Sequence, residues 1–350
     1  MSMAAFSEVI EYEPAELVMT VGAGMPLARM QSLIDEQRQM LAFEPFDHGP
    51  LFGREIGSAT IGGVIGAGVS GSRRVSAGAV RDHVLGFEAV SGRGERFVGG
   101  GRVVKNVTGY DLPKLMAGSW GQLVALTQVT VKVLPKPREM KTVSLRGLDD
   151  ERAVRAMCLA MRSQAEVAAA AHVGKGWGGG GFGPLTGFRL EGFGPSVIAR
   201  AAMLRSALAE FGPADVLSEA DATNFWTSVR DAAPLNDGRP LWRLNVPASS
   251  AALVTSSLRE HDARWYYDWA GGLIWLTMPV DSDAAVVRNA AAHAGGHAAL
   301  VRADAAMRAA VPALHPEPPA VTALARRIKA GFDPANVLDP QRFSPTRHAN

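Results

Sequence analysis

Residues 56–71 read IGSATIGGVIGAGVSG, and the prediction of the fold starts from this glycine-dense stretch. Glycines let a backbone pass close to a ligand and expose its N–H groups, as the pyrophosphate and ring edges of a cofactor require. The stretch lacks the dinucleotide fingerprint, because no strand–helix unit with an acidic residue about 20 positions later frames it. The alternative is that its glycines only permit tight packing of a sheet.

The motifs on either side of this stretch extend the pattern. Upstream, Pro26 opens a helix predicted over 27–37, with apolar residues at helical spacing. Downstream, the segments 84–91 and 96–98 predict a hairpin around Gly92-Arg93-Gly94. Further motifs follow in the order AVRDHVLG (79–86), VKNVTGYDL (104–112), GSWGQL (118–123) and a β-rich run ending in KVLP (132–135).

This order of motifs resembles the FAD-binding domain of the vanillyl-alcohol oxidase and p-cresol methylhydroxylase superfamily. KNVTGYD (105–111), with LWRL (241–244), GGHA (295–298) and FDP (332–334), is similar to one branch, the FAD-binding small subunit of bacterial glycolate oxidase. The resemblance runs from Val9 to Phe343. It implies FAD as the cofactor and an oxidoreductase as the class of protein.

The resemblance also implies which residues contact FAD. Glycines of the 56–71 stretch line the flavin with backbone groups, a following turn lies beneath it, and the KNVTGYD motif forms a wall near the isoalloxazine ring. The implied cofactor-binding residues are Thr60, Gly62, Gly63, Gly66, Ser70, Gly71, Gly78, Arg81, Asp82, Lys105, Asn106, Gly109, Tyr110, Asp111, Gly121 and Leu123. Lys105 is of special interest, because a cation near the flavin N1–C2=O edge stabilises the anionic reduced ring. The alternative for Lys105 is an ordinary surface salt bridge.

Three positions depart from the family pattern. The family has a further N-terminal strand and a Gly-Gly-Gly-Ser-type phosphate loop before the position of Ser7, so we expect an FAD domain whose N-terminal part is truncated. The family's Gly-x-Leu-Gly becomes GQLV (121–124), and its Asn-Pro-Gly becomes LDPQ (338–341). The first departure predicts weaker FAD binding, because part of the pyrophosphate site is missing.

Catalytic candidates are few. His297 suits abstraction of a hydroxyl proton because histidine titrates near neutrality, but no carboxylate or second histidine stands beside it in the sequence. A hydrogen-bonding role is the alternative, and His297 stays a weak candidate. We predict no metal site, and the single cysteine, Cys158, excludes an iron–sulfur cluster held by this chain alone. The aromatic residues Trp265, Tyr266, Tyr267, Trp269 and Trp275 predict a core, or a partner surface if exposed.

Composition and charge exclude several classes. The 350 residues are 47% hydrophobic and 20% charged, which is typical of a globular chain. The formal net charge of +2 gives no case for nucleic acid binding. No apolar run approaches the length of a transmembrane helix, and no secretory signal is visible. We expect a cytoplasmic protein, or one held peripherally at the inner membrane through partner subunits.

The predicted fold is α+β with two domains. Residues 1–137, joined by 326–350, form the vanillyl-alcohol oxidase-type FAD-binding domain. Residues 138–325 form a cap domain, in which an antiparallel sheet is covered by helices on one face. Its predicted strands are 142–145, 187–191, 241–246, 263–269 and 273–277, and its predicted helices are 151–165, 196–210 and 282–294.

The resemblance implies an FAD-binding subunit of a multi-subunit glycolate oxidase, which converts glycolate, a small 2-hydroxy acid, to glyoxylate. The implied partners are a larger FAD-containing catalytic subunit and an iron–sulfur subunit that accepts the electrons. Two alternatives stay open. One is a flavin-poor scaffold subunit of the same complex, and the other is a self-sufficient FAD-dependent 2-hydroxy acid oxidoreductase.

Overall fold

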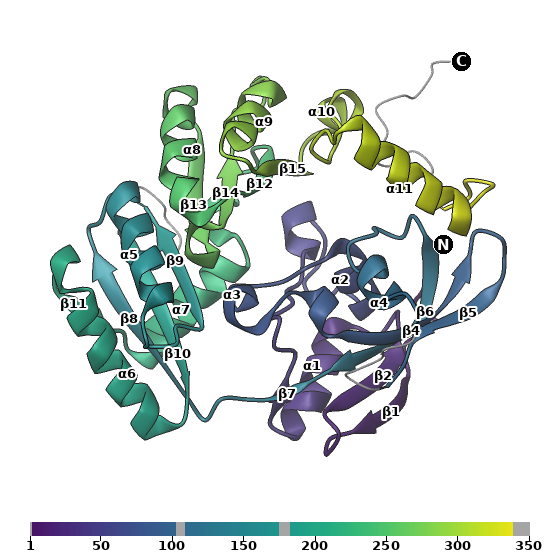
Figure 1. The fold of residues 1–350 in the computed structure, drawn as a ribbon, viewed down its shortest axis with the longest axis horizontal. Coiled ribbons are helices and arrows are strands. Elements are labelled where there is room, and N and C mark those ends of the chain that lie inside the picture. The colour runs from purple at the N-terminus through teal and green to yellow at the C-terminus, as the bar shows by residue number, and fades with distance from the viewer. Residues whose placement is uncertain (1, 103–108, 175–182, 339–350) are drawn as a thin grey trace. The chain divides into compact units, whose positions relative to one another are not determined.

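The structure, a computed structural model, describes residues 2–102, 109–174 and 183–338 (Figure 1). The chain forms two compact units. Unit 1 comprises residues 1–71, 77–136 and 316–350, and unit 2 comprises residues 72–76 and 137–315. Each unit is built on its own main β-sheet, with helices packed against it.

The main sheet of unit 1 is antiparallel, with the strand order β1-β2-β6-β4-β5. Its strands are β1 (Val9–Glu13), β2 (Val18–Gly22), β4 (Val84–Ser91), β5 (Arg96–Gly100) and β6 (Val124–Lys132). A separate ladder joins β3 (Gln39–Met40) to β7 (Leu134–Pro135). The predicted hairpin is confirmed as β4 and β5. The central strand β6 is the predicted β-rich run, and its Val129 and Val131 are fully buried.

The described helices of unit 1 are short apart from the first and the last. They are α1 (Leu27–Glu36), α2 (Ile61–Ala67), α4 (Leu112–Met116) and α11 (Pro319–Phe332), with 3-10 turns at Gly49–Phe52 and Val80–Asp82. The helix α1 buries Leu27, Met30 and Ile34, the apolar face that its spacing predicts. It therefore packs on the unit as an ordinary amphipathic helix.

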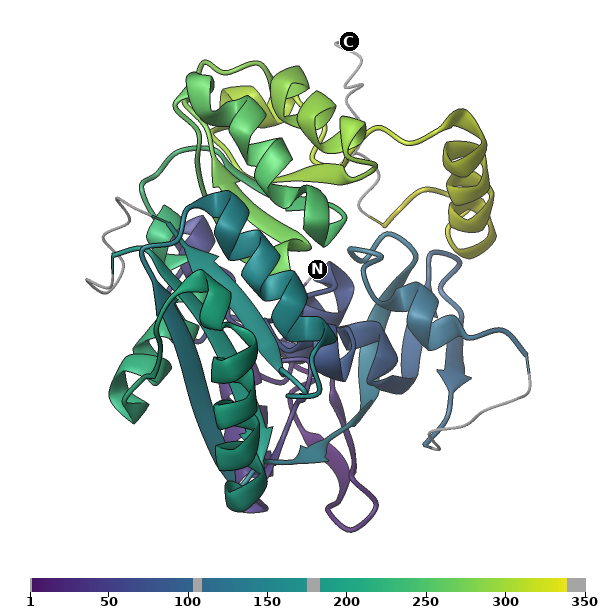
Figure 2. The ribbon, with the colours of Figure 1, turned by 60° about the vertical axis from the view of Figure 1, so that its left-hand side comes forward.

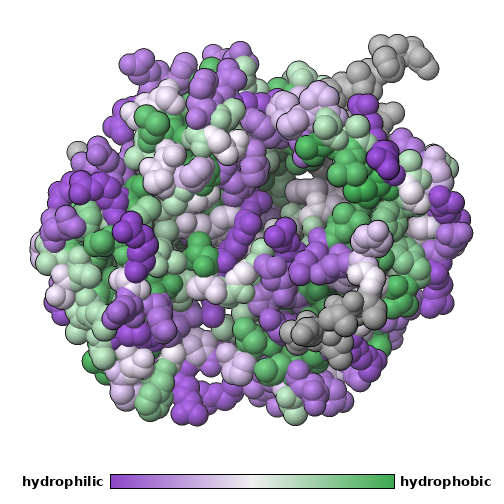
Figure 3. Space-filling model, in the orientation of Figure 1, coloured by the Kyte–Doolittle hydropathy of each residue, from purple (hydrophilic) through white to green (hydrophobic). Residues whose placement is uncertain are grey.

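The helix α11 differs from α1 because none of its residues is buried. Val321 and Leu324, near its start, are 45% and 54% exposed. Hydrophobic side chains are visible over α11 in Figure 3. At its end, the Phe332 ring lies 6.0 Å from the Phe97 ring of β5. The C-terminal end of the helix thus anchors it to unit 1.

The sheet of unit 2 is also antiparallel, with the order β11-β8-β10-β9-β13-β14-β12-β15. The strands are β8 (Glu139–Arg146), β9 (Ala169–Val173), β10 (Leu185–Gly192), β11 (Ala214–Val216), β12 (Leu241–Asn245), β13 (Arg264–Asp268), β14 (Leu273–Thr277) and β15 (His297–Arg302). Two four-stranded halves meet where β9 pairs with β13 at only two positions.

The helices of unit 2 lie on both faces of this sheet. They are α3 (Arg74–Ala77, its last residue in unit 1), α5 (Asp150–Arg162), α6 (Gly194–Ala207), α7 (Glu219–Arg230), α8 (Ala251–Leu258), α9 (Ala284–His293) and α10 (Ala305–Ala310). One large apolar core joins α5, α6, α8 and α9 to the side chains on one face. Figure 2 shows α5 and α6 in front of the strands of the first half.

The helix α7 corrects the prediction that helices cover one face only. Its Trp226 donates a hydrogen bond to the Thr142 hydroxyl at 2.9 Å. Thr142 points away from the large core, because the next residue, Val143, is part of that core and side chains alternate along a strand. The opposite face of the sheet is therefore partly covered by α7.

The predicted boundary at residues 137/138 agrees with the observed one to within one residue, but the units differ from the prediction in two other places. Unit 2 ends at His315, and it takes in residues 72–76, which follow the glycine-rich stretch. Side-chain contacts explain the second difference. Ser72 donates to the Asp268 carboxylate at 2.8 Å, and Ser76 donates to the Ala168 carbonyl oxygen at 2.7 Å.

Candidate functional site

The glycine-rich stretch of unit 1 folds into the helix α2 and the turn after it. Thr60 caps the helix, because its hydroxyl accepts a hydrogen bond from the Gly63 N–H at 3.2 Å. At Gly62 a Cβ atom would come within 2.6 Å of the Ala23 carbonyl oxygen. At Gly63 a Cβ atom would meet only the Thr60 hydroxyl, 3.2 Å away. The adjacent glycines thus differ: Gly62 packs on backbone, and Gly63 faces an open side.

This open side continues onto the segment 118–121. The Gly118 N–H donates to the Ile65 carbonyl at 2.9 Å, and the Trp120 N–H donates to the Gly66 carbonyl at 2.8 Å. Gly118, Trp120 and Gly121 have φ angles of 82°, 56° and 71°. A Cβ atom at Gly118 or Gly121 would meet nothing within 4 Å, and one at Gly66 would meet only the Gly121 nitrogen, at 4.0 Å. We call Gly63, Gly66, Gly118 and Gly121 the glycine strip.

Most backbone donors near the glycine strip are already engaged. The Gly62 N–H donates to the Ala23 carbonyl at 2.8 Å, and the Gly63 and Gly118 N–H groups have the partners given above. Within the described residues, the N–H of Gly121 donates to no other group. The sequence suggested a row of exposed N–H groups. The structure instead offers a surface without side chains and one available donor.

A flavin cofactor fits a surface of this kind, which lacks side chains and offers one backbone donor. Its pyrophosphate or ring edge can approach backbone atoms at positions where a Cβ atom would point into open space. The left-handed conformations at 118–121 resemble the turns that aim backbone N–H groups at anions. The strip is therefore the part of unit 1 best suited to hold the cofactor that the motifs imply.

Ser70 and Gly71 shape the chain after α2. The Ser70 hydroxyl is buried and accepts a hydrogen bond from the Val80 N–H at 3.0 Å. A Cβ atom at Gly71 would lie 2.6 Å from the Glu44 carbonyl oxygen. Both residues thus position the backbone near the glycine strip.

The turn at 78–82 is held by its own side chains. The Asp82 carboxylate accepts a hydrogen bond from the Ala79 N–H at 2.9 Å. Gly78 has a φ angle of 89°, and a Cβ atom there would lie 3.0 Å from the Asp82 carboxylate. Arg81 is exposed and lies 3.8 Å from Asp82. This is the predicted turn, and its carboxylate is occupied in shaping it.

The segment 109–111 leads into α4. Gly109 has a φ angle of 79° with open space around it, and the Tyr110 side chain is 93% exposed. Asp111 caps the helix by accepting the Lys114 N–H at 3.3 Å, and the bond with the Lys114 ammonium lowers the Asp111 pKa. Asp111 therefore has a structural role here. Two further predicted residues, Lys105 and Asn106, lie outside the described residues.

The segment after Gly121 is fixed from two sides. Leu123 lies in a small core. The ammonium group of Lys329, on α11, donates to the Gln122 carbonyl at 2.6 Å and pairs with Asp333. Burial alone would raise the Asp333 pKa, but the Lys329 bond and the Val337 and Leu338 N–H groups lower it overall. The C-terminal segment of unit 1 thus supports the chain next to the glycine strip.

His297, the weak catalytic candidate, lies in unit 2. It is the first residue of β15, it is exposed, and it pairs in register with Asn245 of β12. Its catalytic role stays a prediction.

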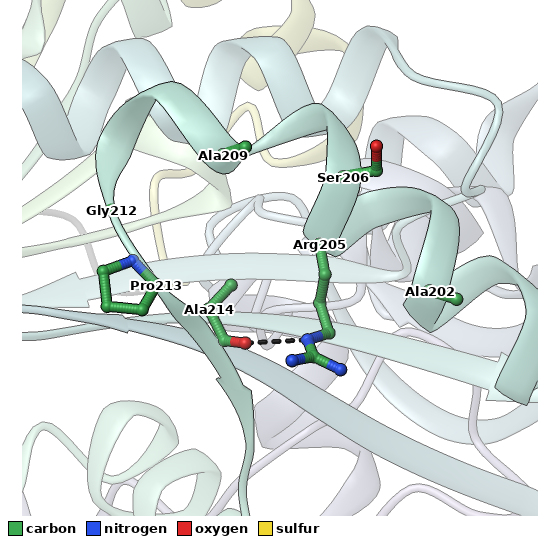
Figure 4. A pocket seen from close by; sticks show the side chains of 7 residues that line it. All are labelled: Ala202, Arg205, Ser206, Ala209, Gly212, Pro213 and Ala214. Carbon is green, nitrogen blue, oxygen red and sulfur yellow. Dashed lines mark hydrogen bonds between the residues drawn. The ribbon is translucent and has the colours of Figure 1, made fainter.

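A shallow depression elsewhere in unit 2 offers no comparable chemistry. Small residues of α6 and the turn before β11 line it, and its Arg205 already donates to the Ala214 carbonyl at 2.7 Å (Figure 4). In the described part of the chain, no group of three or more His, Cys, Asp or Glu side chains is placed to hold a metal ion. None of the described helices combines the length and hydrophobicity that a membrane span requires.

Comparison with known sequences adds two kinds of relative. A family model described as "FAD binding domain" matches residues 1–99. The chain is 30% identical to the "Glycolate oxidase subunit GlcE" of Escherichia coli, over 96% of this chain and 84% of that protein. It is 31% identical to the "Glycolate oxidase subunit GlcD" of Bacillus subtilis, but over only 39% of this chain and 27% of that protein.

Solved structures support the fold. p-Cresol methylhydroxylase with substrate bound aligns with a TM-score of 0.69 at 14% identity, covering 97% of this chain and 78% of that one. An alkyldihydroxyacetonephosphate synthase aligns with a TM-score of 0.67 at 13% identity, covering 97% and 67%. Together with the matched family model, these likenesses confirm the predicted α+β fold class.

Proposed function

Because the chain belongs to a family of FAD-binding glycolate oxidase subunits, we propose that it is an FAD-carrying subunit of a multi-subunit enzyme. The enzyme would oxidise glycolate, or a related short 2-hydroxy acid, to the corresponding 2-oxo acid. The coverage of the Escherichia coli relative, which spans both units, supports a subunit of the same kind.

The glycine strip is the observation that carries the proposal. When bound, FAD supplies a two-electron acceptor for the hydride of the substrate. Gly63, Gly66 and Gly118 would let it approach the backbone without obstruction, and the Gly121 N–H would donate a hydrogen bond to it. The Ser70–Val80 bond would hold the two flanking segments in place. Lys105 would stabilise the reduced ring, as its motif implies.

Electrons would leave through a partner chain. The sequence contains one cysteine, Cys158, which is half-buried, and burial raises its thiol pKa. One thiol cannot ligate an iron–sulfur cluster, which usually takes four cysteines. We therefore assign the cluster to a separate subunit, and substrate oxidation to a larger FAD-containing subunit.

The residues of this chain favour a partner-dependent role over independent catalysis. A 2-hydroxy acid oxidase must hold a carboxylate, remove a hydroxyl proton and align the α-hydrogen with the flavin. His297, the candidate proton acceptor, is exposed at the start of the edge strand β15, and it is therefore not in a site shielded from water. A flavin-poor scaffold is the second candidate, favoured by the single available donor at the glycine strip.

Activity with and without partner subunits tests the proposal. We expect the purified chain not to oxidise glycolate or lactate with an artificial electron acceptor, and turnover to appear when the other subunits are added. Robust turnover by the single chain that is lost in His297→Ala would contradict this and make His297 catalytic. Full activity of a complex whose copy of this chain lacks flavin would favour the scaffold.

A further inference from the structure

The face of the unit 2 sheet that points away from its large apolar core carries polar groups on β12. Trp242 and Leu244 belong to the core, so Arg243 and Asn245 point to the opposite face. Asn245 pairs in register with His297, which therefore shares that face. An arginine, an amide and an imidazole thus occupy neighbouring positions on two strands.

The turn between β13 and β14 presents Trp269 near this face. Trp269, Ala270 and Gly271 have φ angles of 52°, 55° and 101°, in the left-handed region that a tryptophan rarely adopts. The Asp268 carboxylate fixes the turn by accepting the Trp269 N–H at 2.7 Å and the Ser72 hydroxyl at 2.8 Å. A Cβ atom at Gly271 would lie 2.8 Å from the Ala248 carbonyl oxygen. The fold therefore holds Trp269 in a costly conformation, as is common at binding sites.

Two arginines converge on the Trp269 ring. The guanidinium carbon of Arg74 lies 4.2 Å from the ring centroid, and that of Arg243 lies 5.2 Å from it. The two guanidinium carbons can therefore be no more than about 9.4 Å apart, the sum of these two distances. Arg74 comes from the segment 72–76, which the Ser72–Asp268 bond ties to the same turn.

Arg243 is unusual among the arginines of unit 2. Arg189 lies 3.3 Å from Glu191, and Arg259 lies 3.0 Å from Asp150. Arg243 makes no hydrogen bond or ion pair with any other described side chain. Burial and the neighbouring Arg74 lower its pKa to about 10, so it still carries its charge at neutral pH. Arg243 is partly buried, and a cation that loses part of its hydration without gaining an anion is costly to the fold.

We propose that Arg243 and Arg74 form a binding site over Trp269 for the carboxylate of a small acid of the 2-hydroxy or 2-oxo class. A guanidinium presents a planar fork that matches a carboxylate in two parallel hydrogen bonds. One small monoanion would compensate the charge of Arg243, which has no anionic partner among the described side chains. The choice of glycolate and glyoxylate as ligands rests on the proposed function. The presence of an anion site does not, because it follows from the arginines themselves.

Titration calorimetry on the purified full-length chain tests the site, with the flavin-to-protein ratio measured on the same samples. We expect glycolate and glyoxylate to bind, and glycolamide, the uncharged amide of the same size, not to bind. Arg243→Met should weaken binding by about 10- to 100-fold, the factor expected for losing a charge-assisted bond. The affinity of Arg243→Lys should lie between those of the unchanged chain and Arg243→Met, because lysine keeps the positive charge and lacks the planar guanidinium.

The melting temperature separates a binding role from a structural one. Removing a buried cation that lacks a partner should leave the melting temperature of Arg243→Met equal to or above that of the unchanged chain. Arg259→Met is the matched control: it also removes an arginine from a tryptophan ring, but one already paired with Asp150, so binding should persist.

Several results would overturn the site. They are no binding by the unchanged chain, equal loss in Arg259→Met, a large drop in melting temperature in Arg243→Met, or tighter binding of inorganic phosphate than of glyoxylate. Failure of the proposed function would look different. The chain would then contain no flavin and still bind carboxylates in a manner that depends on Arg243.

Discussion

Unit 1 and unit 2 differ in the contacts that pack their interiors. In unit 1, three glycines outside the glycine strip pack against backbone or a buried carboxylate: a Cβ atom would lie 2.6 Å from Ala23 at Gly62, 2.6 Å from Glu44 at Gly71 and 2.1 Å from Asp333 at Gly92. In unit 2, large side chains such as Phe188, Trp242 and Tyr267 fill one continuous core. A glycine contact tolerates no replacement, whereas apolar side chains of similar volume can replace one another. The structural features of unit 1 are therefore easier to recognise from its sequence than those of unit 2.

We expect the largest effect when one methyl group is added at each of two adjacent glycines, Gly62 and Gly63. Gly62→Ala should lower the free energy of unfolding by about 2–3 kcal/mol, because the Ala23 carbonyl cannot move away easily. Gly63→Ala should change it by less than about 1 kcal/mol, since only the Thr60 hydroxyl is near and alanine favours a helix. Urea denaturation of both variants measures the difference. Equal effects at the two positions would mean that Gly62 does not pack as described.

A smaller effect should come from the core of unit 2, through pH. His172 is buried beside Thr186 and Tyr267, and burial lowers its pKa from 6.5 to about 4. Between these values the unfolded chain binds a proton that the folded chain does not. Stability is therefore full above pH 6.5 and falls as the pH decreases towards 4, by about 2 kcal/mol between pH 7 and pH 5.

His172→Gln should remove most of this pH dependence. His315→Gln is the control, because the pKa of His315 is also lowered by burial, but this residue lies outside the core. Denaturation curves at pH 7 and pH 5 provide the measurement. If the free energy of unfolding of His172→Gln depended on pH as strongly as that of the unchanged chain, another group would be responsible for the effect. Glycine variants in unit 1 should leave the pH dependence of the free energy of unfolding unchanged, because His172 lies in unit 2.

Much of unit 1 could be predicted from the sequence because its signals are local. The apolar spacing of α1, the hairpin of β4 and β5, and the glycine-rich stretch are each contained within a few turns of chain. The role of each glycine could not be predicted. Whether Gly62 packs and Gly63 stays open depends on Ala23, about 40 residues earlier. Nothing in the sequence indicates the left-handed conformation of Trp120, because tryptophan does not favour that conformation.

Less of unit 2 could be predicted because its arrangement depends on distant pairing. The strand β9 reads AAAHV, which does not alternate polar and apolar residues, and it was missed along with α7 and β15. The convergence of Arg74 and Arg243 on Trp269 could not be predicted either, because the two arginines of unit 2 lie far apart in the sequence. Only the folded chain brings them together. The expected aromatic core is borne out, since Tyr266, Tyr267, Trp269 and Trp275 are buried.

The visible absorption spectrum of the purified chain tests whether the glycine strip holds FAD. We expect flavin bands, with FAD released on denaturation, and their loss in Gly63→Val, whose side chain would occupy the open side of the glycine strip. The variant should remain folded, as its far-UV circular dichroism and melting temperature would show. An unchanged flavin-to-protein ratio in Gly63→Val, or a folded chain without flavin even in the presence of its partner subunits, would show that the strip is not the flavin site.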